Sequence, residues 1–180
     1  MLFRSEQWAH RGAAIVGVNP LHAMFPHNPA HASPYSPSSR LFLNVLYIDV
    51  EAVEDFRECE EAANEVFSAP FQARLQKLRE APLVDYPAVA ETKLAMLERL
   101  YAHFRERHLS PGSARGQAFR AFQSEGHEHL WRHTLFEALQ EHFHREDPNG
   151  WGWPVWPEPY RKPDSRDVAR FAHQQLDRKS

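Results

Sequence analysis

The chain has 180 residues and a formal net charge of −3, with 25% charged and 42% hydrophobic residues. This length is enough for one domain with a core, or for one domain and part of another. The near-balanced charge argues against binding to nucleic acid or to an acidic membrane surface through overall charge. Cys59 is the single cysteine, and the sequence shows neither a signal-peptide pattern nor a membrane-spanning apolar run. Together these features predict a cytoplasmic protein.

The first apolar segment, residues 13–18, reads A-A-I-V-G-V without polar alternation. Such a strand needs cover on both faces, so we predict a buried strand of a parallel sheet. Pro20 ends it, because proline cannot donate a hydrogen bond to a sheet. A Pro-, Ser- and His-rich loop follows, before a second candidate strand at residues 43–50. A loop of this length inside a compact domain is usually functional.

From residue 51 onward the spacing of apolar residues predicts helices. Pro87 suits the first turn of a long helix. After it, apolar side chains recur every three or four residues: Val89, Leu94, Leu97, Leu100, Tyr101 and Phe104. Two further patterns, at residues 119–122 and 130–143, predict helices separated near Gly126. Ser165 is predicted to cap a last helix. That helix turns three apolar residues inward: Val168, Phe171 and Leu176.

Residues 33–40 read S-P-Y-S-P-S-S-R and form the sharpest motif. Tyr35 offers an aromatic face for the apolar side of a sugar ring, while hydroxyls such as that of Ser33 and the Arg40 guanidinium can hydrogen-bond its edge. The alternative is a turn-rich linker or a disordered phosphoacceptor segment. The position after a predicted buried strand favours a binding site, because α/β folds bind ligands beyond the carboxyl ends of their strands.

Residues 151–161 read W-G-W-P-V-W-P-E-P-Y-R and are the second strong pattern. The tryptophans could stack on sugars at the lip of a cleft. The alternative, which we favour, is a rigid connection that packs the helical part onto its neighbour.

The twelve histidines invite a metal-binding interpretation. His129 and His133 are four residues apart on a predicted helix, as two ligands would be. No H-E-x-x-H motif, cysteine pair or third ligand at fixed spacing accompanies them. We predict no metal site and no cofactor.

Three segments occur in a telling order: N-P-L-H-A at residues 19–23, S-P-Y-S-P-S-S-R at 33–40 and L-N-V-L-Y-I-D at 43–49. In this order they resemble the 4-alpha-glucanotransferases, also called amylomaltases or disproportionating enzymes. The W-G-W-P-V-W-P-E-P-Y-R run is similar to the bacterial members that carry a helical insertion after the first strand.

The resemblance implies an α/β fold class, a partial (β/α)8-barrel segment followed by a mostly α-helical subdomain. Residues 1–50 would be the first barrel strand and its substrate loop. Residues 51–180 would be the helical insertion, with a Trp- and Pro-rich connection at 148–163. The implied activity is the transfer of α-1,4-glucan segments between maltooligosaccharides, with Ser33 and Tyr35 lining the donor sugar site.

The chain lacks the family's R-I-D-H, G-E-D-L-G and T-H-D elements, which supply the carboxylates for retaining glycosyl transfer. A barrel of this class also takes about 250 residues. We therefore predict no catalytic residue in this chain and an inactive fragment, with the remainder of the barrel as a further partner. Two alternatives stay open: a non-catalytic α-glucan-binding module and a helical protein-interaction module.

Overall fold

The computed structural model describes the backbone of residues 2–177 and the side chains of residues 6–174. In chain order the α-helices and strands are α1 (Leu2–His10), β1 (His22–Ala23), β2 (Ser39–Leu43), α2 (Glu54–Glu58), α3 (Glu60–Val66), α4 (Ala69–Glu80), α5 (Tyr86–Phe104), α6 (Ala114–Glu125), α7 (His127–Glu146) and α8 (Arg166–Asp177). Short helical segments are η1 (Val45–Tyr47), η2 (Val50–Ala52), the π-helical η3 (Arg105–Leu109), η4 (Trp153–Val155) and η5 (Glu158–Tyr160). The described part is mostly helical.

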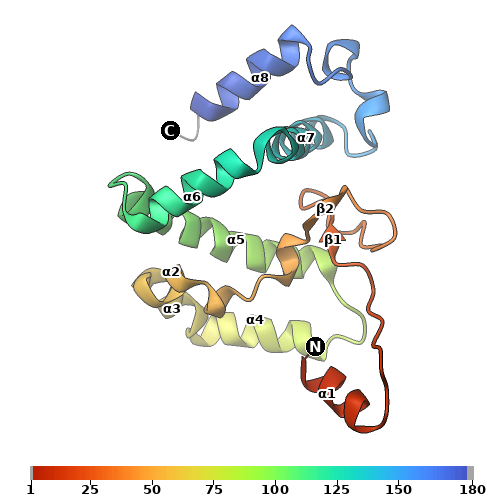
Figure 1. Cartoon of the computed structure of the whole chain (residues 1–180), viewed down its shortest axis with the longest axis vertical. Helices are drawn as coiled ribbons and strands as arrows, with labels where there is room; N and C mark the ends of the chain where they lie inside the picture. The colour runs from red at the N-terminus through yellow and green to blue at the C-terminus, as the bar shows by residue number, and fades with distance from the viewer. Residues whose placement is uncertain (1, 178–180) are drawn as a thin grey trace.

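The helices lie in tiers along the long axis of the molecule (Figure 1), from α4 through α5, α6 and α7 to α8. β1 and β2 form a small antiparallel ribbon beside these tiers, between the levels of α5 and α7. Phe42 of β2 stacks on His133 of α7, with ring centroids 4.4 Å apart. The ribbon and its loop are therefore held against α7.

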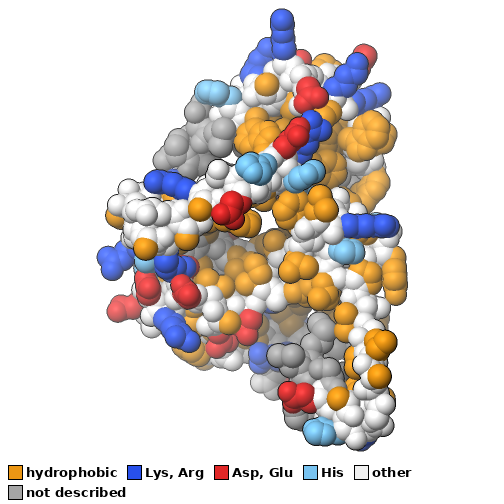
Figure 2. Space-filling model, in the orientation of Figure 1, with side chains coloured by type: hydrophobic (Ala, Val, Ile, Leu, Met, Phe, Trp, Pro, Cys, Tyr) orange, Lys and Arg blue, Asp and Glu red, His pale blue; other side chains and the backbone are white. Residues whose placement is uncertain are grey.

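The predicted strand at residues 13–18 is wrong for this chain. These residues form no regular element, and Ile15 is 88% exposed. The physical reason is that a strand needs backbone partners, and the sheet among the described residues pairs only β1 with β2. Figure 2 shows apolar side chains along the extended segment that leads from α1 to β1. A barrel segment is thus not confirmed.

The second predicted strand, residues 43–50, is also misplaced. The strand ends at Leu43, and η1 and η2 follow it. Asn44 Oδ1 accepts the N–H of Leu46 at 3.0 Å, and Asp49 Oδ1 accepts that of Glu51 at 3.2 Å. Such side-chain bonds stabilise turns at the expense of strands.

The long helix predicted after Pro87 is confirmed as α5. Asp85 Oδ1 accepts the N–H of Ala88 at 3.0 Å and caps its first turn. The inward stripe of α5 packs against α2 and α3 in the first core cluster, which consists of Phe56, Cys59, Ala62, Val66, Met96 and Leu100. Cys59 is buried there.

The remaining predicted helices are confirmed as α6, α7 and α8. Gly126 separates α6 from α7. Ser165 Oγ accepts the N–H of Val168 at 3.2 Å, as predicted for the cap of α8. The second core cluster consists of Leu139, Phe143, Trp156, Val168 and Phe171. The side chain of Leu176 lies outside the described residues.

No helix among residues 2–177 has both the length and the apolar character that a lipid bilayer requires.

Candidate functional site

A cleft of about 330 Å³ lies between the loop after residue 18 and the start of α5. His22, Phe25 and His31 line its loop side, and Tyr86 and Val89 of α5 line the opposite side. The wall is thus largely aromatic and apolar, with imidazoles and amides among the rings. A pocket of this size and character suits a small ligand with one apolar face.

Ser33 and Tyr35 lie at the edge of this cleft. Pro34, between them, belongs to its lining, whereas Ser33 and Tyr35 do not. The Ser33 carbonyl accepts the N–H of Ser36 at 3.0 Å and closes a turn. The Tyr35 hydroxyl donates to Asn19 Oδ1 at 3.1 Å, and Asn19 lines the cleft. Tyr35 is 70% exposed, so its ring is open to a ligand.

Lys93 of α5 holds the segment around η1 against that helix. Its Nζ donates to the carbonyls of Leu46 at 2.7 Å and Ile48 at 2.8 Å. The ammonium thereby satisfies two backbone acceptors that follow the ribbon. The apolar pattern of α5 gave no sign of this bond.

Trp151 joins the loop from the other proline-rich block. Its ring centroid lies 4.9 Å from that of Phe25 and 4.6 Å from that of His31. Sequence reasoning missed this contact, because no local pattern links residues so distant along the chain. The two irregular blocks, predicted separately, therefore meet at one place.

The other tryptophans divide between the core and the surface. Trp156 is buried and packs on Phe136 and Phe143, with centroids 5.7 and 5.3 Å apart. Trp153 is exposed. Trp156 therefore packs within the helical part itself, and it is Trp151 that contacts a segment outside that part.

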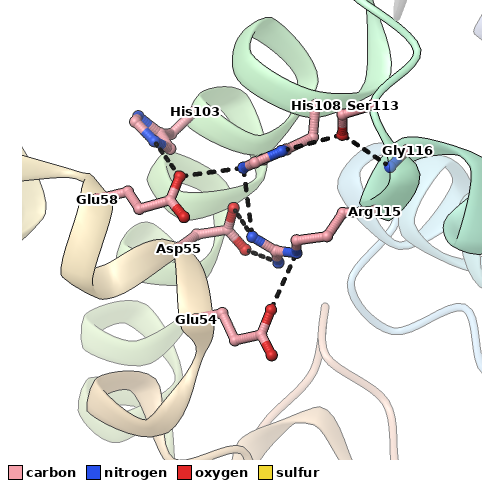
Figure 3. Close-up of polar contacts among 8 residues, drawn as sticks. All are labelled: Glu54, Asp55, Glu58, His103, His108, Ser113, Arg115 and Gly116. Atoms are coloured by element: carbon pink, nitrogen blue, oxygen red, sulfur yellow. Dashed lines mark hydrogen bonds and ion pairs between the residues drawn. The ribbon is translucent and has the colours of Figure 1, made fainter.

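A charged cluster joins α6 to α2 (Figure 3). Arg115 donates from both terminal nitrogens to the two carboxylate oxygens of Asp55, at 3.1 and 2.7 Å. Its Nε pairs with Glu54 Oε2 at 3.0 Å. The guanidinium also lies over the Phe104 ring, with Cζ 5.5 Å from the centroid. Its hydrogen bonds to the Asp55 carboxylate raise the pKa of Arg115 above its usual range.

His108, in η3, extends this cluster (Figure 3). Its Nε2 lies 3.1 Å from Glu58 Oε2, and its Nδ1 lies 3.1 Å from Ser113 Oγ. Ser113 Oγ also accepts the N–H of Gly116 at 3.3 Å and so caps α6. His103 Nε2 is 3.9 Å from the same Glu58 oxygen. The cluster therefore ties α2, α5, η3 and α6 together.

These carboxylates are engaged in contacts between helices. Retaining glycosyl transfer needs two carboxyl groups about 5–5.5 Å apart that can both reach the sugar. Asp55 is buried and both its oxygens bind Arg115. Glu58 is paired with His108. A bidentate, buried pair of this kind is a structural link between helices.

The two histidines whose spacing suggested a pair of ligands, His129 and His133, lie in different surroundings. His129 is exposed, whereas His133 is half-buried and stacks on Phe42. Within residues 2–177, no three His, Cys, Asp or Glu side chains converge to hold a metal ion.

An aromatic cleft with a hydroxyl-rich loop at its edge offers the two kinds of contact that a carbohydrate needs, an apolar surface and hydrogen-bonding groups. A family model described as 4-alpha-glucanotransferase matches residues 4–179, and the chain belongs to this family.

Curated relatives agree with this assignment. A 4-alpha-glucanotransferase of Haemophilus influenzae is 38% identical over 154 residues, which cover 84% of this chain and 22% of the relative. Two relatives with the same description, from Mycobacterium tuberculosis and Mycobacterium bovis, are 32% identical over 181 residues. That match covers 92% of this chain and 22% of each relative. The chain therefore spans about a fifth of the length of these relatives.

Proposed function

We propose that this chain is the donor-sugar segment of a 4-alpha-glucanotransferase, an enzyme that moves α-1,4-glucan segments between maltooligosaccharides. The observation that supports it most is the S-P-Y-S-P-S-S-R loop at the edge of the aromatic cleft. Family membership supports the reaction, and the open Tyr35 ring supports its place in sugar binding.

In this proposal Tyr35 covers the apolar face of the donor sugar, and the Ser33 hydroxyl hydrogen-bonds its edge. The bond from Tyr35 to Asn19 limits how the tyrosine side chain can turn. A ring held in place loses little conformational entropy when the sugar arrives. The donor site is thus partly formed before the sugar binds.

The reaction itself requires groups that this chain does not offer. One carboxylate must attack the sugar and form a glycosyl-enzyme, and a second must act as acid and then as base. We assign both carboxylates to the parts of the related enzymes that lie outside the region matched by this chain. In the same arrangement residues 1–50 join those segments in a barrel, and residues 51–180 form the helical subdomain. The whole enzyme works in the cytoplasm.

The isolated 180-residue chain is expected to show no transferase activity. Covalent catalysis loses most of its rate when the nucleophile or the acid/base is missing. The measurement incubates pure chain with maltotriose and follows glucose and longer oligomers against a boiled control. Turnover above that control would contradict the assignment of the chemistry to other segments.

Binding of maltotriose without turnover is the expected companion result. A folded chain that binds no sugar at millimolar concentration would contradict the donor-sugar assignment.

A further inference from the structure

Two buried polar side chains face each other between the loop of the ribbon and α7. His27, in the loop between β1 and β2, faces Glu137 on α7, with Nδ1 4.0 Å from Oε2. The side chains are 4% and 19% exposed, respectively. Neither ring nitrogen of His27 and neither carboxyl oxygen of Glu137 has a hydrogen-bond partner at ordinary distance. Buried polar atoms are rarely left in this state without a reason.

The groups around this pair carry no fixed positive charge. His133 Nδ1 lies 4.0 Å from Glu137 Oε1, and the His144 ring centroid lies 5.1 Å from that of His27. Gln140, one turn along α7 from Glu137, is buried with its Oε1 unpaired. Among the described residues Glu137 pairs with no lysine or arginine, only with His27 and His133.

Ser38 supplies the remaining polar contact from the ribbon side. Its hydroxyl is close enough to oppose the upward shift of the Glu137 pKa. The same hydroxyl donates to the carbonyls of Ala23 at 3.2 Å and Met24 at 2.9 Å. Two backbone carbonyls compete for its single proton, so Ser38 offsets only part of the effect of burial on the Glu137 pKa.

Burial moves the two pKa values in opposite directions. It raises the pKa of Glu137 to about 7, and it lowers the pKa of His27 to about 4, with a smaller contribution from His144. Burial also lowers the pKa of His133. Between about pH 4 and 7, the Glu137 carboxyl is therefore mostly protonated and the His27 imidazole is mostly neutral.

We propose that His27 and Glu137 form a neutral pair that shares one proton and thereby positions the loop that carries Ser33 and Tyr35 on α7. The Glu137 O–H donates to a ring nitrogen of His27. Between about pH 4.5 and 6.5, the imidazole of the undocked loop carries this proton and the carboxylate is charged. Docking moves that proton from nitrogen to oxygen, so two charges disappear and no proton is gained from or lost to solvent. The 4.0 Å separation has to shorten by about 1 Å for this bond to form.

The pair itself adds almost no pH dependence to docking, whereas the lowered pKa of His133 contributes a slope of its own. The raised pKa of Glu137 favours docking below its ordinary value of 4.5, and this contribution is lost as pH rises to about 7. The lowered pKa of His27 favours docking above its ordinary value of 6.5, and this contribution is lost as pH falls to about 4. The two slopes have opposite signs and cancel where they overlap, between about pH 4.5 and 6.5. Removing one partner should therefore expose the slope of the other.

Amide exchange in the ribbon measures this directly. The N–H groups of Ser38 and Asn44 bond to the carbonyls of Ala23 and Leu21, at 2.9 and 3.0 Å. Their protection factors, corrected for intrinsic exchange, are compared from pH 4.5 to 6.5 in the 180-residue chain, in His27→Phe and Glu137→Gln, and in a control. Glu141→Gln is the control, because Glu141 is an exposed residue on the same helix, paired with Arg145.

The wild-type chain and Glu141→Gln should share one slope. Relative to them, protection in His27→Phe should fall with pH, and protection in Glu137→Gln should rise with pH. Each change should approach about tenfold per pH unit, the slope of one proton. Equal slopes in all four proteins, or slopes of the same sign in the two variants, would overturn the proposal.

A second measurement needs no variant to remain folded. The carboxyl ¹³C resonance of Glu137 in the wild-type chain should titrate with a midpoint near 7, and a midpoint near the ordinary 4.5 would overturn the proposal. Both measurements use no sugar, so their outcome is independent of the proposed transferase function.

Discussion

Replacing Arg115 by methionine is expected to lower the free energy of unfolding by about 3 kcal/mol. Arg115 fills both oxygens of Asp55, which is buried. Methionine keeps much of the side-chain volume but leaves an uncompensated carboxylate between α2 and α6. Urea unfolding, followed by circular dichroism near pH 7, measures the change.

Two further variants separate this buried pair from an ordinary surface pair. Arg74→Met removes an exposed pair with Glu91 and is expected to cost less than about 1 kcal/mol. The double variant Asp55→Asn, Arg115→Met should recover much of the loss, because no buried charge remains. If Arg115→Met and Arg74→Met cost the same, the cluster of Figure 3 does not hold the helices together.

In an enzyme that contains this chain together with the remaining segments, Tyr35→Ala should lower kcat/KM at least tenfold, or about 1.4 kcal/mol. The reason is the loss of an aromatic surface for the donor sugar and the loss of its orientation. Initial rates of maltotriose disproportionation measure the effect.

Tyr35→Phe is the matched control. It keeps the ring and removes only the bond to Asn19 Oδ1, so most of the activity should remain. Unchanged kinetics in a correctly folded Tyr35→Ala variant would reduce the loop to a structural role.

The helices could be predicted because their signals are local. The helix after Pro87 and the Ser165 cap each depend on signals within a few turns, and both occur, in α5 and α8. The stripe was predicted only in part: Leu100 and Phe104 are buried, but Tyr101 is exposed. The prediction of a strand at residues 13–18 failed for this chain, because a strand depends on partners elsewhere, which a local pattern does not reveal. An apolar run such as this one indicates a buried strand only if neighbouring strands are present.

The same distinction applies to the candidate site. Its loop was identified from the sequence of residues 33–40. The cleft beside it could not be predicted, and it is lined by Pro34 but not by Ser33. Trp151 and the His27–Glu137 pair were missed. Each depends on a contact between segments that are distant in sequence, and a histidine or glutamate among many gives no sign of burial.

The most direct test of the proposed function locates the reaction's nucleophile. A fluorinated maltosyl fluoride traps the glycosyl-enzyme of the retaining reaction, and peptide mapping by mass spectrometry then finds the labelled carboxylate. In an enzyme that includes this chain, we expect the label on a residue outside residues 1–180, with none on Asp55, Glu54 or Glu58. A stoichiometric label on any carboxylate within residues 1–180 would contradict the division between a sugar-binding loop here and catalysis elsewhere.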